Sequence, residues 1–131
     1  MHARRDGLER YRQTQVQSRT PLELVVMLYD GALQFLGTAR DAIARSDVAA
    51  RREAINRALA VVSELQNTLD LERGGDLAVA LDRLYSYVNA RLLDAAALND
   101  TAPVDEARRV LAILRDGWTT IAAPPPGGAA R

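Results

Sequence analysis

The chain has 131 residues, of which 48% are apolar and 26% charged, as in a single compact globular domain. Seventeen basic residues balance seventeen acidic ones, so no excess positive charge is available for a phosphate backbone and we expect no nucleic acid partner. The absence of cysteine excludes disulfides and cysteine-based metal sites. Because no apolar run approaches the length of a membrane span, we expect a cytoplasmic protein without membrane insertion.

Residues 1–19 form a polar segment in which Tyr11 and Val16 are isolated apolar side chains. We interpret this segment as a mobile N-terminal arm that can dock on another surface. The first helix is predicted to begin at TPLE, because Thr20 suits the N-cap, Pro21 suits the first helical position and Glu23 completes a capping box. It is expected to run to about residue 45.

Three further helices follow, each with an apolar stripe at helical spacing. Asp47 is predicted to cap the second, Gly74 and Gly75 to end it and reverse the chain, and Pro103 to start the fourth. The inward residues of the second helix are Val48, Ile55, Leu59, Val62, Leu65 and Leu69. Those of the third, over 76–98, are Leu77, Leu81, Leu84, Val88, Leu92 and Ala95. Those of the fourth are Ala107, Val110, Leu111, Leu114, Trp118 and Ile121.

Four helices of similar length joined by short links predict an all-α fold, an antiparallel up-down four-helix bundle. We assign residues 20–122 to the bundle, residues 1–19 to the mobile arm and residues 123–131 to a disordered tail rich in proline and glycine. The bundle core accounts for most of the apolar residues, so the function must be sought in the apolar residues that the core does not require.

The first helix carries more apolar surface than one core face requires. Its core stripe comprises Leu22, Val25, Val26, Tyr29, Leu33, Leu36 and Ile43. A second stripe, turned well away from the first, comprises Leu24, Leu28, Gly31, Phe35 and Ala42. Either the helix lies obliquely against several neighbours or beneath the arm, or this stripe forms a groove for an amphipathic helix of another chain. Glycine inside a helix costs about 1 kcal/mol relative to alanine, so we expect another backbone or a bulky side chain to approach Gly31.

A second candidate binding region lies on the third helix. Arg91 is the one charge within the apolar arc, and Tyr85 and Tyr87 lie near its edges. Either Arg91 covers the core with its stem while its head reaches water, or the three residues form a partner-binding rim, since tyrosine and arginine are enriched at interaction hot spots.

No catalytic residue, metal site or cofactor is predicted, and we do not expect an enzyme. His2 is the only histidine, which rules out a metal site built from several histidines. Carboxylates such as Glu53 have arginine neighbours at helical spacing, here Arg57, which indicates solvated ion pairs.

Three blocks of the sequence resemble segments of a known family. SRTPLELVVMLYDGALQFL, residues 18–36, is similar to a first-helix signature with a Ser/Thr-Pro start and a Met-Leu-Tyr/Phe-Asp-Gly-Ala core. SELQNTLDLERGGDLAVALDRLYSYVNARLLDAAALND, residues 63–100, resembles an Asp-x-Glu-Lys/Arg-Gly-Gly loop followed by a Leu-Tyr-x-Tyr-Met-x-x-Arg-Leu helix, and ILRDGWTTI, residues 113–121, resembles a closing Leu-Arg-Asp-Ala-Trp segment. The family is that of the flagellar secretion chaperones, FliS, and the similarity covers roughly residues 11–121. Departures are Ser86, Val88, Ala90 and Gly117.

The resemblance implies a cytoplasmic chaperone that binds the C-terminal segment of flagellin, prevents its premature polymerisation and helps deliver it to a component of the flagellar export gate. It also implies that the protein's own N-terminal segment occupies part of the client site, a docking role that we carry over to Tyr11. The expected partner-binding residues are Tyr11, Val16, Leu24, Leu28, Gly31, Phe35, Tyr85, Tyr87 and Arg91. Two alternatives remain: a structural bundle that self-associates, at least weakly, through the same face, and a helical adaptor for another secreted client.

Overall fold

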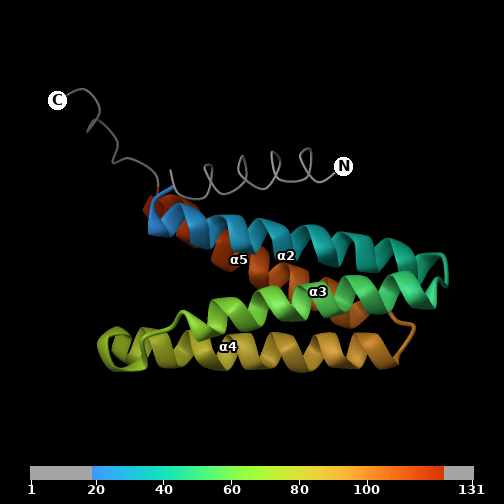
Figure 1. Cartoon of the computed structure of the whole chain (residues 1–131). Helices are drawn as coiled ribbons and strands as arrows, with labels where there is room; N and C mark the ends of the chain where they lie inside the picture. The colour runs from blue at the N-terminus through green and yellow to red at the C-terminus, as the bar shows by residue number, and fades with distance from the viewer. Residues whose placement is uncertain (1–18, 123–131) are drawn as a thin grey trace, which may run out of the picture.

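The computed structural model describes residues 19–122, which form four α-helices and no strand (Figure 1). The helices are α2 (Pro21–Ala44), α3 (Val48–Asn67), α4 (Leu71–Ala97) and α5 (Ala102–Ala122). Consecutive helices run in opposite directions (Figure 1), which confirms the predicted all-α helical bundle. The predicted arm, apart from residue 19, and the predicted tail lie outside the described residues.

Local capping chemistry fixes the starts of α2 and α3 as predicted. Thr20 Oγ1 accepts a hydrogen bond from the Glu23 backbone N–H at 3.2 Å, and Glu23 Oε1 accepts one from the Thr20 backbone N–H at 3.3 Å. Together these bonds form the capping box. Asp47 Oδ1 accepts from the Ala50 backbone N–H at 3.1 Å, which satisfies a free donor in the first turn of α3.

The reversal between α3 and α4 differs from the prediction. α3 ends at Asn67, and the chain turns over residues 68–70 rather than at the glycine pair. Asp70 then caps α4, because its side chain accepts from the Arg73 backbone N–H at 3.0 Å. Gly75, at φ 56° and ψ −137°, interrupts the helical backbone, so the glycines bend the start of α4 instead of ending α3.

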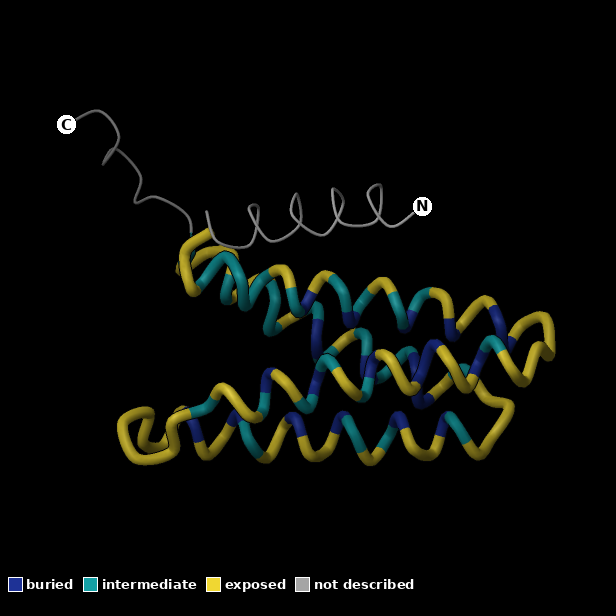
Figure 2. Tube along the Cα trace, in the orientation of Figure 1, coloured by how far each residue is buried: buried dark blue, intermediate teal, exposed yellow. Residues whose placement is uncertain are grey.

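The core runs along the inward faces of all four helices, as the buried segments in Figure 2 show. Its largest fully buried side chains are Tyr29, Tyr85, Leu36, Ile55, Leu65, Leu92, Leu111, Val62, Val88 and Val104. Four residues predicted to face inward are exposed instead: Val48, Leu77, Leu84 and Ile121. Val48 starts its helix, whereas Leu77 and Ile121 lie where α4 and α5 diverge. Leu84 is displaced because its neighbour Tyr85, only 1% exposed, takes the inward position.

The bundle has a closed end and an open end. At the closed end the buried Arg51 of α3 donates to Asn99 Oδ1 at 3.1 Å and to the Ala96 carbonyl at 3.2 Å. Arg40 of α2 pairs with Asp105 of α5 at 2.8 Å. Towards the other end, α2 and α5 separate from α3 and α4 (Figure 1). The molecule opens there into two helix pairs.

Each helix pair at the open end is held together by polar contacts of its own. Asp30 of α2 pairs with Arg115 of α5 at 2.6 Å. Gln66 of α3 donates to Asp82 Oδ1 of α4 at 2.8 Å and to Ser86 Oγ at 2.9 Å. These contacts keep the partners of each pair in register while the two pairs diverge.

The second apolar stripe of α2 divides between these two ends. Phe35 packs against the core and carries the Arg57 guanidinium of α3 at 5.8 Å from its ring centroid, and Ala42 is fully buried. The interpretation that α2 touches several neighbours therefore holds for this half, because α2 lies between α3 and α5. Among the described helices α2 alone is long and apolar enough to cross a membrane, and 22% of its apolar window is buried in the bundle.

Candidate functional site

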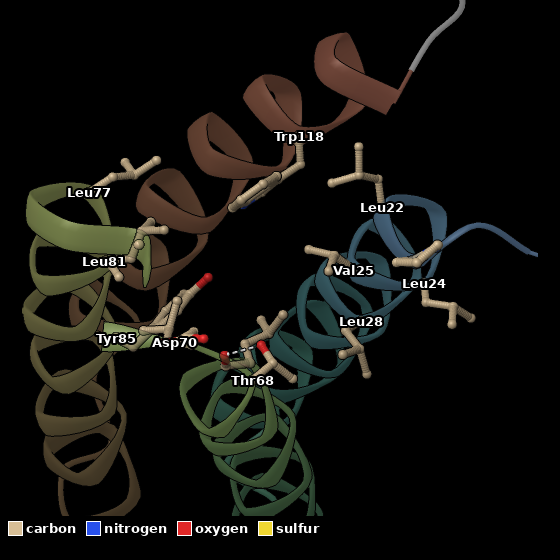
Figure 3. A pocket seen from close by; sticks show the side chains of 15 residues that line it. Leu22, Leu24, Val25, Leu28, Thr68, Asp70, Leu77, Leu81, Tyr85 and Trp118 are labelled. Atoms are coloured by element: carbon tan, nitrogen blue, oxygen red, sulfur yellow. Dashed lines mark hydrogen bonds between the residues drawn. The ribbon is translucent and has the colours of Figure 1, made fainter. Parts of the chain in front are cut away.

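An apolar groove of about 590 Å³ lies at the open end of the bundle (Figure 3). α2 forms one wall, the start of α4 forms the other, and Trp118 of α5 lies between them. The lining residues are Pro21, Leu22, Leu24, Val25, Leu28, Leu65, Thr68, Leu69, Asp70, Gly74, Leu77, Ala78, Leu81, Tyr85 and Trp118. Such a surface has few polar groups to satisfy and suits an apolar or amphipathic occupant.

The wall formed by α4 depends on close packing at Gly74. A Cβ atom at this position would lie 2.5 Å from the Cβ atom of Ala78, closer than two carbon atoms can approach without movement. Gly74 therefore allows the first turn of α4 to fold against the next one and to complete the groove.

A chain of three polar side chains crosses the base of the groove. Trp118 Nε1 of α5 donates to Tyr29 Oη of α2 at 3.1 Å, and the Tyr29 and Tyr85 hydroxyls share a hydrogen bond of 2.5 Å. Burial raises the pKa of both tyrosines above the ordinary value, so both are neutral near pH 7. The chain joins α2, α4 and α5 where the two helix pairs begin to separate.

Three of the predicted binding residues converge on this groove, namely Leu24, Leu28 and Tyr85. Gly31 lies one turn from Leu28, and no atom of another described helix lies within 4 Å of where its Cβ would be. Among residues 19–122 no neighbouring helix therefore supplies the backbone or bulky side chain expected at Gly31, and the binding role of Gly31 stays a prediction. Phe35 lies beside α3, away from the groove. Tyr11 and Val16 lie outside the described residues, and their role stays a prediction.

Tyr87 and Arg91 lie apart from the groove and contact α5. Both bond to Glu106: the Tyr87 hydroxyl donates to Glu106 Oε1, and Arg91 Nε donates to Oε2 at 3.0 Å. Arg91 also pairs with Asp94 at 3.2 Å. The Tyr87 hydrogen bond, followed by the charge of Arg91, lowers the pKa of the Glu106 carboxyl below the ordinary value. These side chains clamp α4 to α5, and their binding role stays a prediction.

Sequence reasoning missed Leu77 and Trp118 as groove residues. Both were assigned to the core because their spacing matches the inward stripes of α4 and α5. The glycine pair was a usable signal, because it indicates a bend at the start of α4 and hence a wall that departs from its neighbours. The divergence of α5 from α4 has no comparable local marker.

Comparison with known proteins connects this groove to a family. The model of the family described as Flagellar protein FliS matches residues 4–125. The chain belongs to the FliS family. Flagellar secretion chaperone FliSB of Pseudomonas aeruginosa is 38% identical over 109 residues, which are 83% of this chain and 86% of that protein. The FliS proteins of Salmonella typhimurium and Bacillus subtilis are 35% and 34% identical, over 88% and 82% of this chain and 89% and 80% of theirs.

The three sequence blocks that resemble FliS proteins meet at the groove. Leu28 comes from the first block, Leu81 and Tyr85 come from the second, and Trp118 comes from the third. As a member of the FliS family, the chain is a flagellar secretion chaperone that serves flagellum biogenesis, and such a role requires no catalysis. Among residues 19–122, no three histidine, aspartate or glutamate side chains converge as metal ligands would.

Proposed function

We propose that this protein binds the C-terminal segment of flagellin in the open-end groove, keeps that segment from polymerising before export and helps deliver it to the flagellar export gate from the cytoplasm. The observation that supports the proposal most directly is the groove itself, because apolar side chains from three FliS-like blocks line one cavity. Such a cavity can accept the apolar face of a client helix.

The mechanism is coupled folding and binding without chemistry. From Leu77 to Tyr85 the α4 wall spans about 12 Å at 1.5 Å per residue, enough for about two turns of a client helix. A longer client continues over other surfaces and buries on the order of 2,000 Å². Ordering a disordered client costs several kcal/mol, so a large contact combines with reversible affinity, as release at the export apparatus requires.

Co-purification with flagellin tests this proposal. We expect the full chain to retain the host's flagellin and to lose it when the C-terminal segment of flagellin is removed. Retention of the truncated flagellin would contradict binding through that segment. A tight dimer in sedimentation whose formation blocks flagellin binding would instead support the self-associating bundle.

A matched pair of variants tests the groove. Leu77 and Leu93 both lie on α4 and are 66% and 60% exposed, but only Leu77 lines the groove. We expect Leu77→Asp to weaken flagellin binding at least tenfold, because binding would bury an unpaired charge, and Leu93→Asp to leave it within twofold. Equal affinities for the two variants would place the client elsewhere.

A further inference from the structure

One hydroxyl hydrogen beneath the groove has no hydrogen-bond acceptor in the described part of the chain. The Trp118 indole N–H and the Tyr29 and Tyr85 hydroxyls together supply three donor hydrogens. They make only two hydrogen bonds, from Trp118 to Tyr29 and between the two tyrosines. Whichever tyrosine donates to the other, one hydroxyl hydrogen has no acceptor among residues 19–122.

Both tyrosines are buried, with Tyr29 0% and Tyr85 1% exposed, so their position relative to the groove decides which hydroxyl keeps that hydrogen. Tyr29 does not line the groove, and a hydrogen left on its hydroxyl would be a costly donor with no acceptor within reach. Donation from Tyr29 to Tyr85 removes this cost and leaves the extra hydrogen on Tyr85. Tyr85 lines the groove, and Figure 3 shows its hydroxyl end directed into the enclosed space. The polar chain therefore runs from Trp118 through Tyr29 to Tyr85.

We propose that Tyr85 is a specificity-determining residue whose hydroxyl donates a hydrogen bond to a polar side chain on the otherwise apolar face of the client. This inference rests on the proposed function. In a helical client the backbone carbonyls are already paired within the helix, and an ionised carboxylate is costly to bury in an apolar groove. The acceptor is therefore an uncharged side-chain oxygen of Asn, Gln, Ser or Thr. A purely apolar segment fits the groove walls but leaves the Tyr85 hydrogen unpaired.

Two single-atom variants separate this role from a merely structural one. Tyr85→Phe removes the hydroxyl that faces the groove, whereas Ser63→Ala removes a hydroxyl of α3 that does not line the groove. Circular dichroism verifies the fold of each full-length variant. The ligand is a synthetic peptide of the flagellin C-terminal segment, and calorimetry measures its affinity for each variant. We expect Tyr85→Phe to bind about tenfold more weakly and the control Ser63→Ala to stay within twofold.

Alanine replacements at each Asn, Gln, Ser and Thr of the peptide then locate the acceptor. One replacement should weaken binding to the wild-type chain about tenfold and leave binding to Tyr85→Phe unchanged, because the interaction is already absent there. Equal affinities of Tyr85→Phe and wild type, or equal effects of every peptide replacement on both chains, would overturn the inference alone. Failure of the wild-type chain to bind the peptide would overturn the proposed function as well.

Discussion

At the scale of single residues, two glycines near the groove have opposite surroundings. Gly31 lies within α2, and no atom of another described helix lies within 4 Å of the place where a Cβ atom would stand. Gly74 has the Ala78 Cβ atom 2.5 Å from that place. The first glycine is therefore tolerated by the bundle, whereas the second is required by it.

Alanine substitutions at these two positions should change stability in opposite directions. Gly31→Ala should raise the free energy of unfolding by about 0.5–1 kcal/mol, because alanine loses less backbone entropy in a helix. Gly74→Ala should lower it by about 1–3 kcal/mol, because Ala78 and the first turn of α4 must move. Urea denaturation measures both. Gly117→Ala, in open space on α5, is the control and should behave like Gly31→Ala.

At the scale of helices, α4 and α5 are joined by a titratable clamp. Glu106 of α5 accepts from Tyr87 and Arg91 of α4, and both contacts favour its ionised form. Its folded pKa therefore lies below the ordinary glutamate value. A carboxyl of this kind stabilises the fold above its unfolded pKa, and the contribution disappears as the pH falls through the folded pKa.

Acidic pH should therefore weaken the contacts of Glu106 with Tyr87 and Arg91. Between about pH 4.5, the ordinary glutamate value, and more acidic pH, the wild-type chain should lose unfolding free energy as Glu106 becomes protonated. The Glu106→Gln variant should be less stable at pH 7 and should show a flatter dependence over this range. Chemical denaturation at a series of pH values checks the slope. Glu64→Gln, an exposed position on α3, should keep the wild-type slope, and equal slopes for Glu106→Gln and wild type would refute the clamp.

At the scale of the whole molecule, the contacts that close one end of the bundle are missing from the other. In the closed half, Tyr87 and Arg91 of α4 bond to Glu106 of α5 and Arg57 of α3 lies over Phe35 of α2, so contacts cross between the two helix pairs. At the open end Asp30–Arg115 and Gln66–Asp82 join helices only within each pair. The Tyr29–Tyr85 bond crosses between the pairs at the base of the groove. The groove therefore begins where contacts between the α2/α5 pair and the α3/α4 pair end.

Deletion of residues 1–18 tests whether the N-terminal segment with Tyr11 and Val16 covers this groove. If it does, the truncated chain should bind more of a hydrophobic fluorescent dye than the full chain and should show altered affinity for flagellin. Thr20 remains in place to cap α2. Leu77→Asp in the truncated chain should suppress the added dye signal, because Leu77 lines the groove. Unchanged dye binding and affinity would leave the segment without a docking role.

Much of the fold could be predicted from the sequence because its determinants are local. Thr20 with Glu23 and Asp47 satisfy free backbone donors within one turn, so the starts of α2 and α3 follow from short motifs. The apolar stripes repeat every three or four residues and predict four packed helices. The boundary between α3 and α4 was predicted wrongly at the glycine pair, because Asp70 caps α4 before that pair is reached.

The candidate site required the tertiary structure, because it depends on the angle between helices rather than on their composition. By itself, the sequence determined four amphipathic helices, an excess of apolar surface on α2 and a resemblance to FliS proteins. Only the tertiary structure decided that Leu28 opens on a cavity while Phe35 packs beside α3, and that Tyr85 turns inward while Leu84 does not. The physical reason is that apolar residues with the same helical spacing pack into the core where the helices converge and line a groove where the helices diverge.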